Sequence, residues 1–189
     1  MTERPQFKDL EINPIKMAIL ETGWMNALER RDSQEFLKYI SEGLTHQYHL
    51  SRSSAEKAAD YLLISLGKEE TQEGQANIIR YHELLSQESG LGFDPFEASK
   101  KYLELFKKGK MDVDYDDVYK YHSILYGELG ELASDNLRLS TRMRVGSINK
   151  YQMIRNGKNT AEANKAFGRL FGELVESYTV LNKALTGLI

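Results

Sequence analysis

Two pairs of glutamates are the residues of this sequence whose type and spacing best fit a chemical role. Glu128 and Glu131 lie in the segment LYGELGE, and Glu173 and Glu176 lie in its near-repeat LFGELVE. In a helix, a spacing of three residues puts the members of each pair on neighbouring surface positions. Carboxylate oxygens are preferred ligands of Mg²⁺, so four converging glutamates would make a magnesium site. The same spacing is also typical of the solvated edge of a helix.

The string ELGEL, which begins at Glu128, resembles the E-x-G-E-L core of the all-α nucleoside triphosphate pyrophosphohydrolases of the MazG and dimeric dUTPase type. The string GELVESYTVL, which begins at Gly172, resembles their second acidic helix. The resemblance implies a magnesium-dependent enzyme that holds its metal with Glu128, Glu131, Glu173 and Glu176. The chain departs from the family pattern at Gly127, where a glutamate is usual, and at Glu176, where an aspartate is customary.

Other catalytic groups are scarce. The chain has no cysteine, which excludes thiolate catalysis and cysteine-ligated metals. His46 lies one turn beyond Glu42, and His49 follows His46 by three residues, but neither an H-E-x-x-H nor an E-x-x-H motif occurs. Phosphate-binding glycine loops and a nucleophile elbow are absent as well. We therefore expect a non-enzymatic protein without a cofactor, and we keep the magnesium enzyme as the alternative.

Positive charge is concentrated in one stretch of the chain. Residues 138–169 contain eight cations and one anion, a net charge of +7, which leaves −10 for the rest of a chain whose total is −3. Such a tract complements the acidic remainder, within one subunit or between subunits, or it contacts nucleic acid. The candidate anion or nucleic-acid contacts are Arg138, Arg142, Arg144, Lys150 and Arg155. Nucleic acid is the second alternative, because no known nucleic-acid motif accompanies these residues.

The elements that must position these residues are helices. Asn13 before Pro14 and Asp94 before Pro95 are typical helix starts, and Ser53 with Glu56 forms a possible capping box. No stretch shows the alternation of a half-buried strand between turns. The sequence predicts an all-α fold with helices near 14–31, 33–49, 54–66, 71–88, 95–108, 115–156 and 160–187.

The last two predicted helices carry heptad patterns. Seam positions repeat with 4-3 spacing from Val118 to Met143 and again from Ala163 to Leu188. They are mostly apolar, with polar residues at His122, Asn136 and Ser177. A turn at Gly157 would make them a long antiparallel helical hairpin, with a possible break near Gly146. The predicted interface residues are Leu125, Leu129, Leu132, Leu139, Phe167, Leu170, Leu174 and Leu181.

These patterns predict a helical bundle with residues 1–90 as an N-terminal bundle and 91–189 as a C-terminal hairpin region, together forming one compact unit. No apolar run approaches the ~18 residues that span a bilayer, so we expect no membrane contact. The charged N-terminus favours the cytoplasm. We expect an assembly or interaction protein that forms a homo-oligomer, or binds a protein partner, through its C-terminal hairpin.

Overall fold

The computed structural model describes residues 11–107, 114–127, 134–156 and 160–186. The predicted all-α class is confirmed, because the regular elements in these ranges are all helices. The helices are α1 (Pro14–Arg30), α2 (Ser33–Tyr48), α3 (Arg52–Ser65), α4 (Gln72–Ser89), α5 (Pro95–Lys107), α6 (Tyr115–Tyr126), α8 (Ser134–Asn156) and α9 (Thr160–Thr186). No helix within these ranges is long and apolar enough to cross a membrane.

Short polar side chains fix where the helices begin. The Asn13 side chain accepts a hydrogen bond from the Lys16 N–H at 3.0 Å, and the Asp94 side chain accepts one from the Phe96 N–H at 2.8 Å. The start of α3 differs from the prediction, because Ser51 and not Ser53 caps it and accepts from the Ser54 N–H at 3.2 Å. Each cap pairs a backbone donor that the helix itself leaves unpaired.

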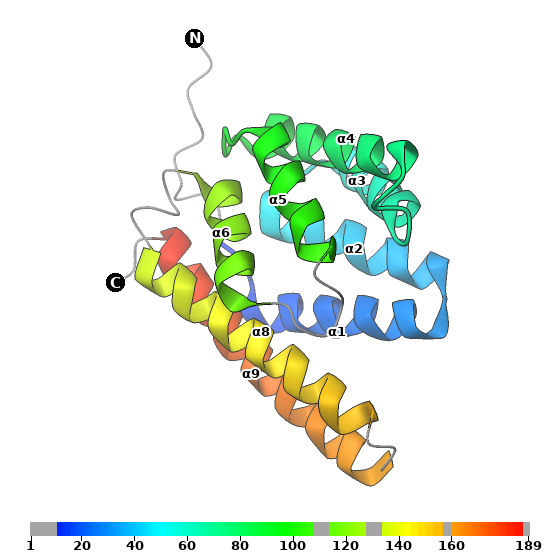
Figure 1. Ribbon diagram of the computed structural model, residues 1–189. Helices are drawn as coiled ribbons and strands as arrows, with labels where there is room; N and C mark the ends of the chain where they lie inside the picture. The colour runs from blue at the N-terminus through cyan, green and yellow to red at the C-terminus, as the bar shows by residue number, and fades with distance from the viewer. Residues whose placement is uncertain (1–10, 108–113, 128–133, 157–159, 187–189) are drawn as a thin grey trace.

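Each helix packs on the next along the chain, and α9 returns to pack on α1 (Figure 1). Helices α8 and α9 lie side by side, and their far ends extend past α1 and stand clear of the other helices (Figure 1). Ser140 and Ser177 mark the contact between them: the Ser140 hydroxyl lies 2.9 Å from the Ser177 carbonyl oxygen, to which it can donate. The α8–α9 pair is called the arm below.

The predicted single helix over 115–156 is wrong. Helix α6 ends at Tyr126, and Gly127 takes a φ of 52° with a ψ of −128°, which only glycine adopts easily. Its N–H still donates to the Ser123 carbonyl oxygen at 3.0 Å and closes the last turn. The break resets the helical register, so a heptad carried through Gly127 no longer predicts which side of α8 is buried. The possible break at Gly146 does not occur, because α8 continues through it.

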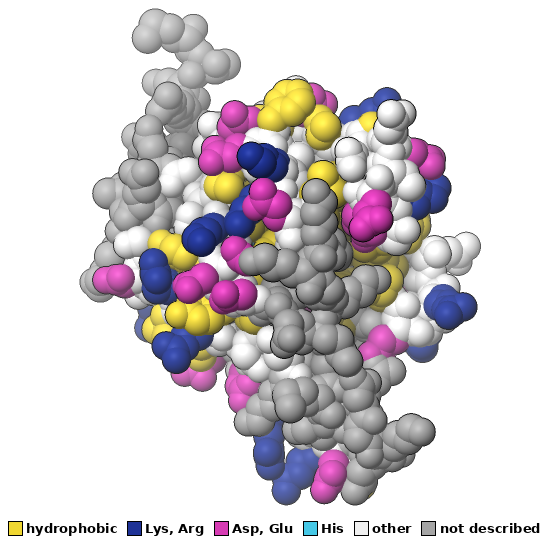
Figure 2. All heavy atoms as spheres, viewed as in Figure 1, with side chains coloured by type: hydrophobic (Ala, Val, Ile, Leu, Met, Phe, Trp, Pro, Cys, Tyr) yellow, Lys and Arg dark blue, Asp and Glu magenta, His cyan; other side chains and the backbone are white. Residues whose placement is uncertain are grey.

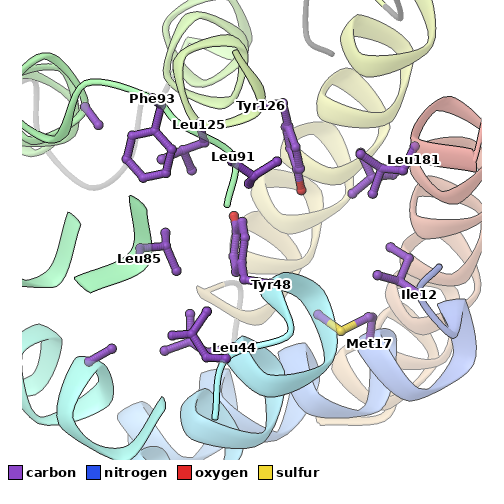
Figure 3. Close-up of a cluster of buried hydrophobic side chains, with 14 of the residues drawn as sticks. Ile12, Met17, Leu44, Tyr48, Leu85, Leu91, Phe93, Leu125, Tyr126 and Leu181 are labelled. Carbon is purple, nitrogen blue, oxygen red and sulfur yellow. The ribbon is translucent and has the colours of Figure 1, made fainter. Parts of the chain in front are cut away.

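One large hydrophobic cluster joins residues from both halves of the chain. Leu44 and Tyr48 of α2 meet Leu125 and Tyr126 of α6 and Leu181 of α9 (Figure 3). The segment between α4 and α5, which resembles a linker in sequence, also buries Leu91 and Phe93 in this cluster. Burial of these side chains ties the N-terminal helices to the arm.

The break at Gly127 gives the first test. We expect Gly127→Ala to lower the free energy of unfolding by about 1–3 kcal/mol, because alanine is strained at this φ and ψ. A Cβ would meet only the Leu91 carbonyl oxygen at 3.5 Å, an ordinary contact, so the cost comes from the backbone. Urea unfolding measures the change, and an unchanged midpoint would contradict the described break.

Candidate functional site

A buried ion pair lies where α1, α8 and α9 meet. Glu21 of α1 is 2% exposed, and its Oε1 accepts a hydrogen bond from Nε of Arg144 at 2.7 Å. Its Oε2 accepts a hydrogen bond from the hydroxyl of Tyr178 at 2.7 Å. The Arg144 guanidinium also lies 5.6 Å from the centre of the Tyr178 ring. Both carboxylate oxygens of Glu21 are therefore paired, which a buried charge requires.

Arg144 is charged in this setting. Burial disfavours its charge, but the Glu21 carboxylate more than offsets that effect, so the pKa of Arg144 lies above its ordinary value. Burial raises the pKa of Tyr178 well above its usual range, so the hydroxyl keeps its proton and donates to Glu21. The cluster contains one positive and one negative group and is nearly neutral as a whole.

Tyr48 of α2 and Tyr126 of α6 lie in the same hydrophobic cluster as Tyr178. The rings of Tyr48 and Tyr126 stack with centres 6.3 Å apart, and their hydroxyls point toward each other (Figure 3). The Gln47 side chain donates to the Tyr126 hydroxyl at 2.7 Å and lies 3.3 Å from the Tyr48 hydroxyl. Burial raises the pKa of both tyrosines, while the charge of Arg144 lowers it, so Arg144 lies within electrostatic reach of both hydroxyls.

His82 of α4 is completely buried and fully paired. Its Nδ1 lies 2.9 Å from the Ile78 carbonyl oxygen and 3.0 Å from the Ser99 hydroxyl, and its Nε2 lies 2.9 Å from the Tyr121 hydroxyl. A carbonyl oxygen only accepts, so Nδ1 carries the proton and Nε2 accepts from Tyr121. Burial lowers the pKa of His82 to about 4, so the ring is neutral at pH 7.

His122, which the sequence placed in a helix seam, pairs with α8. Its Nδ1 lies 3.0 Å from the Thr141 hydroxyl. Burial and then the nearby charge of Arg144 lower the pKa of His122 to about 3. A neutral histidine held in this way serves the packing of α6 on α8 and is not set up to exchange protons near pH 7.

The glutamates proposed as metal ligands lie partly outside the described residues. Glu128 and Glu131 fall in the range 128–133, which the structure does not describe. Glu173 is half-buried on α9, and Glu176 is exposed on the same helix. Within the described ranges, no group of three or more histidines, aspartates or glutamates is placed to hold a metal ion. The magnesium site therefore stays a prediction.

The three basic residues of α8 whose side chains are described have partners inside the chain. Arg138 lies 3.8 Å from Asp116 and 4.4 Å from the centre of the Tyr119 ring, and Arg142 lies 5.6 Å from the centre of the Tyr115 ring. Arg144 pairs with Glu21, and its side chain is 23% exposed. The side chains of Lys150 and Arg155 are not described.

Charge on the visible surface is mixed in sign. On the face shown in Figure 2, cationic and anionic side chains are interspersed and do not form one basic patch. A nucleic-acid contact normally needs a clustered basic stripe. This face gives no support to that alternative.

Most predicted interface leucines belong to the core. Leu125, Leu170, Leu174 and Leu181 are buried within the single chain, so they are not available to a partner. Leu139 is 48% exposed, because the buried side of α8 carries Leu137, Ser140, Thr141 and Val145 instead. Phe167 is partly buried, and Leu129 and Leu132 lie outside the described residues.

The outer side of α9 has an unusual composition. Lys165, Gly168, Gly172 and Glu176 recur at helical spacing and are all exposed. A Cβ added at Gly168 or Gly172 would meet nothing within 4 Å. In the described residues, no ion pair engages Lys165 or Glu176. These four residues are called the α9 outer face below.

Two isoleucines of α1 are exposed. Ile15 is 57% exposed and Ile19 is 50% exposed, although both are large and apolar. Ala18, between them in the chain, is buried in a cluster with Leu170 and Leu174 of α9. Ile15 and Ile19 are one turn apart, so they form an apolar strip next to this α1–α9 contact.

A shallow groove of about 720 Å³ runs between α2 and α3, with Lys16 of α1 at its side. Its lining includes Glu42, His46, Glu56 and Asp60. Burial, followed by the charge of Lys16, lowers the pKa of His46. Both acidic and basic side chains line the groove, so its charge is mixed in sign.

Comparison of the chain with known protein families, with curated proteins and with solved structures finds no match. The function must therefore be argued from the geometry of the chain itself. Sequence reasoning missed Glu21 entirely and named Arg144 only as one member of a basic tract that pairs with the acidic remainder of the chain or contacts an anion. No spacing connects these two residues, which lie 123 positions apart and meet only because α9 brings α8 back to α1.

The ion pair generates one test. We expect Glu21→Gln and Arg144→Met each to lower the free energy of unfolding by about 3–5 kcal/mol, because either change leaves a buried charge without its partner. The double variant Glu21→Gln with Arg144→Met should lose clearly less than the sum of the two. Additive losses in urea unfolding would mean that the two groups do not depend on each other.

His82 generates a second test, on pH dependence. The pKa is about 4 in the folded chain and 6.5 for an ordinary histidine, so between these values the unfolded chain binds a proton that the folded chain does not. The contribution of His82 to the free energy of unfolding is therefore complete above pH 6.5 and is lost as the pH falls toward 4. The loss is about 3 kcal/mol in all.

The His82→Gln variant separates this contribution from that of other groups. It should be less stable than the wild type at pH 7 and should lose less of its remaining stability between pH 7 and pH 4.5. Urea unfolding at the two pH values gives the comparison. An equal loss in both proteins would show that His82 is not the titrating group.

Proposed function

We propose that this protein is a non-enzymatic helical assembly protein that forms a homodimer through the outer face of its C-terminal arm. The observation that carries the proposal is the pair of exposed glycines, Gly168 and Gly172, in the middle of α9. An exposed glycine inside a helix costs about 1 kcal/mol relative to alanine. Space for a Cβ exists at both positions, so the fold of the single chain does not require glycine there.

Glycine on an outer face allows a second helix to approach closely. The distance between two packed helices depends on the side chains at the contact, and residues without a Cβ bring the backbones nearest. Gly168 and Gly172 are four residues apart and therefore lie on one side of α9. A second copy of α9 that crosses here would fill the space that the glycines leave.

The charges beside the glycines complement themselves in an antiparallel pair. Lys165 precedes Gly168 by three residues, and Glu176 follows Gly172 by four. A two-fold axis between the glycines brings Lys165 of one copy opposite Glu176 of the other, and the same contact occurs twice. A parallel pair would instead place like charges together. The second copy is therefore the occupant that this surface fits.

The exposed isoleucines of α1 would add apolar area to this contact. Ile15 and Ile19 are exposed on α1, and Ala18 between them in the chain packs on α9. Burying a large aliphatic side chain contributes roughly 1.5–3 kcal/mol when burial is complete. Leu139 lies on the outer side of α8, and it is an exposed member of the predicted interface set.

A charge exchange tests the dimer. We expect the wild type to have the mass of a dimer in light scattering at micromolar concentration. Lys165→Glu should raise the dissociation constant roughly tenfold, because two attractive contacts become repulsive. The double variant Lys165→Glu with Glu176→Lys should restore dimerisation. A wild type that is monomeric throughout would contradict the proposal, and so would a double variant as weak as the single one.

Alanine at the glycines separates folding from assembly. Gly172→Ala should raise the stability of the monomer by about 0.5–1 kcal/mol and weaken the dimer, because the new methyl group separates the helices. Gly43→Ala on α2 is the matched control, since a Cβ there also meets nothing within 4 Å. The control should be stabilised without any change in dimerisation. Equal dimerisation in both variants would argue against contact at Gly172.

A further inference from the structure

The groove between α2 and α3 has a floor of small and apolar side chains. Leu37, Ser41 and Thr45 of α2 line it and are partly buried. They recur every four residues and extend over roughly 12 Å of the helix axis. A row at this spacing is the kind of surface against which a row of side chains from another helix packs. The shape of the groove therefore suits a helix.

Charged side chains lie along both sides of this floor. They also recur every four residues, on α2 as Lys38, Glu42 and His46, and on α3 as Arg52, Glu56 and Asp60. Only residues 49–51 separate α2 from α3, so the two helices run antiparallel. Arg52 therefore lies level with the end of α2 that carries His46. One turn further along the groove, Glu56 lies level with Glu42.

Several of these charges are not paired within the chain. Arg52 and Glu56 form an ion pair at 2.9 Å along α3. Among the described residues, no ion pair engages the other charged members of the lining, which are Lys16, Lys38, Glu42 and Asp60. These groups can pair with charges that another molecule brings.

The unpaired charges change sign along the groove. Only residues 31–32 separate α1 from α2, so Lys16 near the start of α1 lies level with His46 near the end of α2. Burial and then the charge of Lys16 lower the pKa of His46, so at pH 7 this end of the groove carries an ammonium group and a neutral imidazole. Glu42 lies one turn earlier on α2, about 6 Å away along the helix axis. A positive end of the groove is thus followed by a negative part.

We propose that this groove docks a helix of a partner protein that carries an acidic and a basic residue one turn apart beside a row of apolar side chains. The acidic residue would pair with Lys16, and the basic residue would pair with Glu42. The apolar row would pack on Leu37, Ser41 and Thr45. None of these residues belongs to the proposed dimer contact on α9, so the docking is independent of dimerisation.

The two signs of charge in the groove select a partner that carries both. A helix with two acidic residues would bring one of them against Glu42, and a helix with two basic residues would bring one against Lys16. Like charges at a contact are unfavourable, and this repulsion discriminates between partners more than it adds affinity. The shallow groove leaves its charges in contact with water, so each ion pair contributes modestly.

NMR titration of the full chain with synthetic helical peptides tests the groove. Three alanine-rich peptides of about 18 residues, long enough to be helical in isolation, carry a leucine row beside two charged positions one turn apart. The charged positions hold one glutamate and one lysine, two glutamates, or two lysines. We expect the mixed peptide to shift amide signals of α2 and α3 saturably, with a dissociation constant of about 1 mM. Each like-charged peptide should bind roughly fivefold more weakly.

A charge reversal in the groove should change which peptide binds best. Glu42→Lys makes the negative part of the groove positive, so the peptide with two glutamates should bind more tightly than the mixed peptide. Glu42 is exposed, and its replacement leaves the core intact. Glu88→Lys, the same change at an exposed position of α4, is the matched control and should keep the wild-type order of affinities.

Four results would overturn the proposal. The first is the absence of a saturable shift in α2 and α3 with the mixed peptide at millimolar concentration. The second is equal affinity of the wild type for all three peptides, and the third is an unchanged order of affinities in Glu42→Lys. The fourth is binding of free lysine, a small zwitterion, as tightly as the mixed peptide, which would show that the groove does not recognise a helix.

Discussion

The hydrogen-bonded ion pair between Glu21 and Arg144 is the interaction on which the rest of the structure depends. It joins the first helix of the chain to the arm, and Tyr178 adds the last helix to the same carboxylate. A charge buried to this extent is tolerated only with its partner in place, so the pair fixes how α1, α8 and α9 rotate about their axes. Apolar side chains supply most of the buried surface between these helices, and the ion pair selects one way of packing them.

The orientation of α9 has consequences on both of its sides. Tyr178 is hydrogen-bonded to Glu21 and Ser177 to Ser140, so this inner side of α9 packs against α1 and α8 of the same chain. Gly168 and Gly172 are then left on the outside, where no described residue approaches a Cβ position. The rotation of α9 about its own axis therefore decides both points. It directs Tyr178 and Ser177 into the chain, and it leaves the two glycines of the proposed assembly surface outside.

Local signals in the sequence predicted the helices well, and long-range pairing could not be predicted. Asn13 and Asp94 mark helix starts because a cap acts within three residues. Gly127 was missed as a break because a heptad pattern on both sides of it outweighed a single glycine. The partner of Arg144 within the chain could not be named, because Glu21 lies 123 positions away in the sequence. The packing of α9 on α1 brings them together, and no local pattern reports it.

The central claim is that two copies of α9 meet at Gly172, and disulfide trapping measures this most directly because the chain has no cysteine of its own. A disulfide forms only when the two Cα atoms lie about 4.4–6.8 Å apart. Under mild oxidation at micromolar concentration, Gly172→Cys should become a covalent dimer within minutes, and Gly43→Cys on α2 should not. A Gly172→Cys protein that stays monomeric, or that cross-links no faster than Gly43→Cys, would contradict the account.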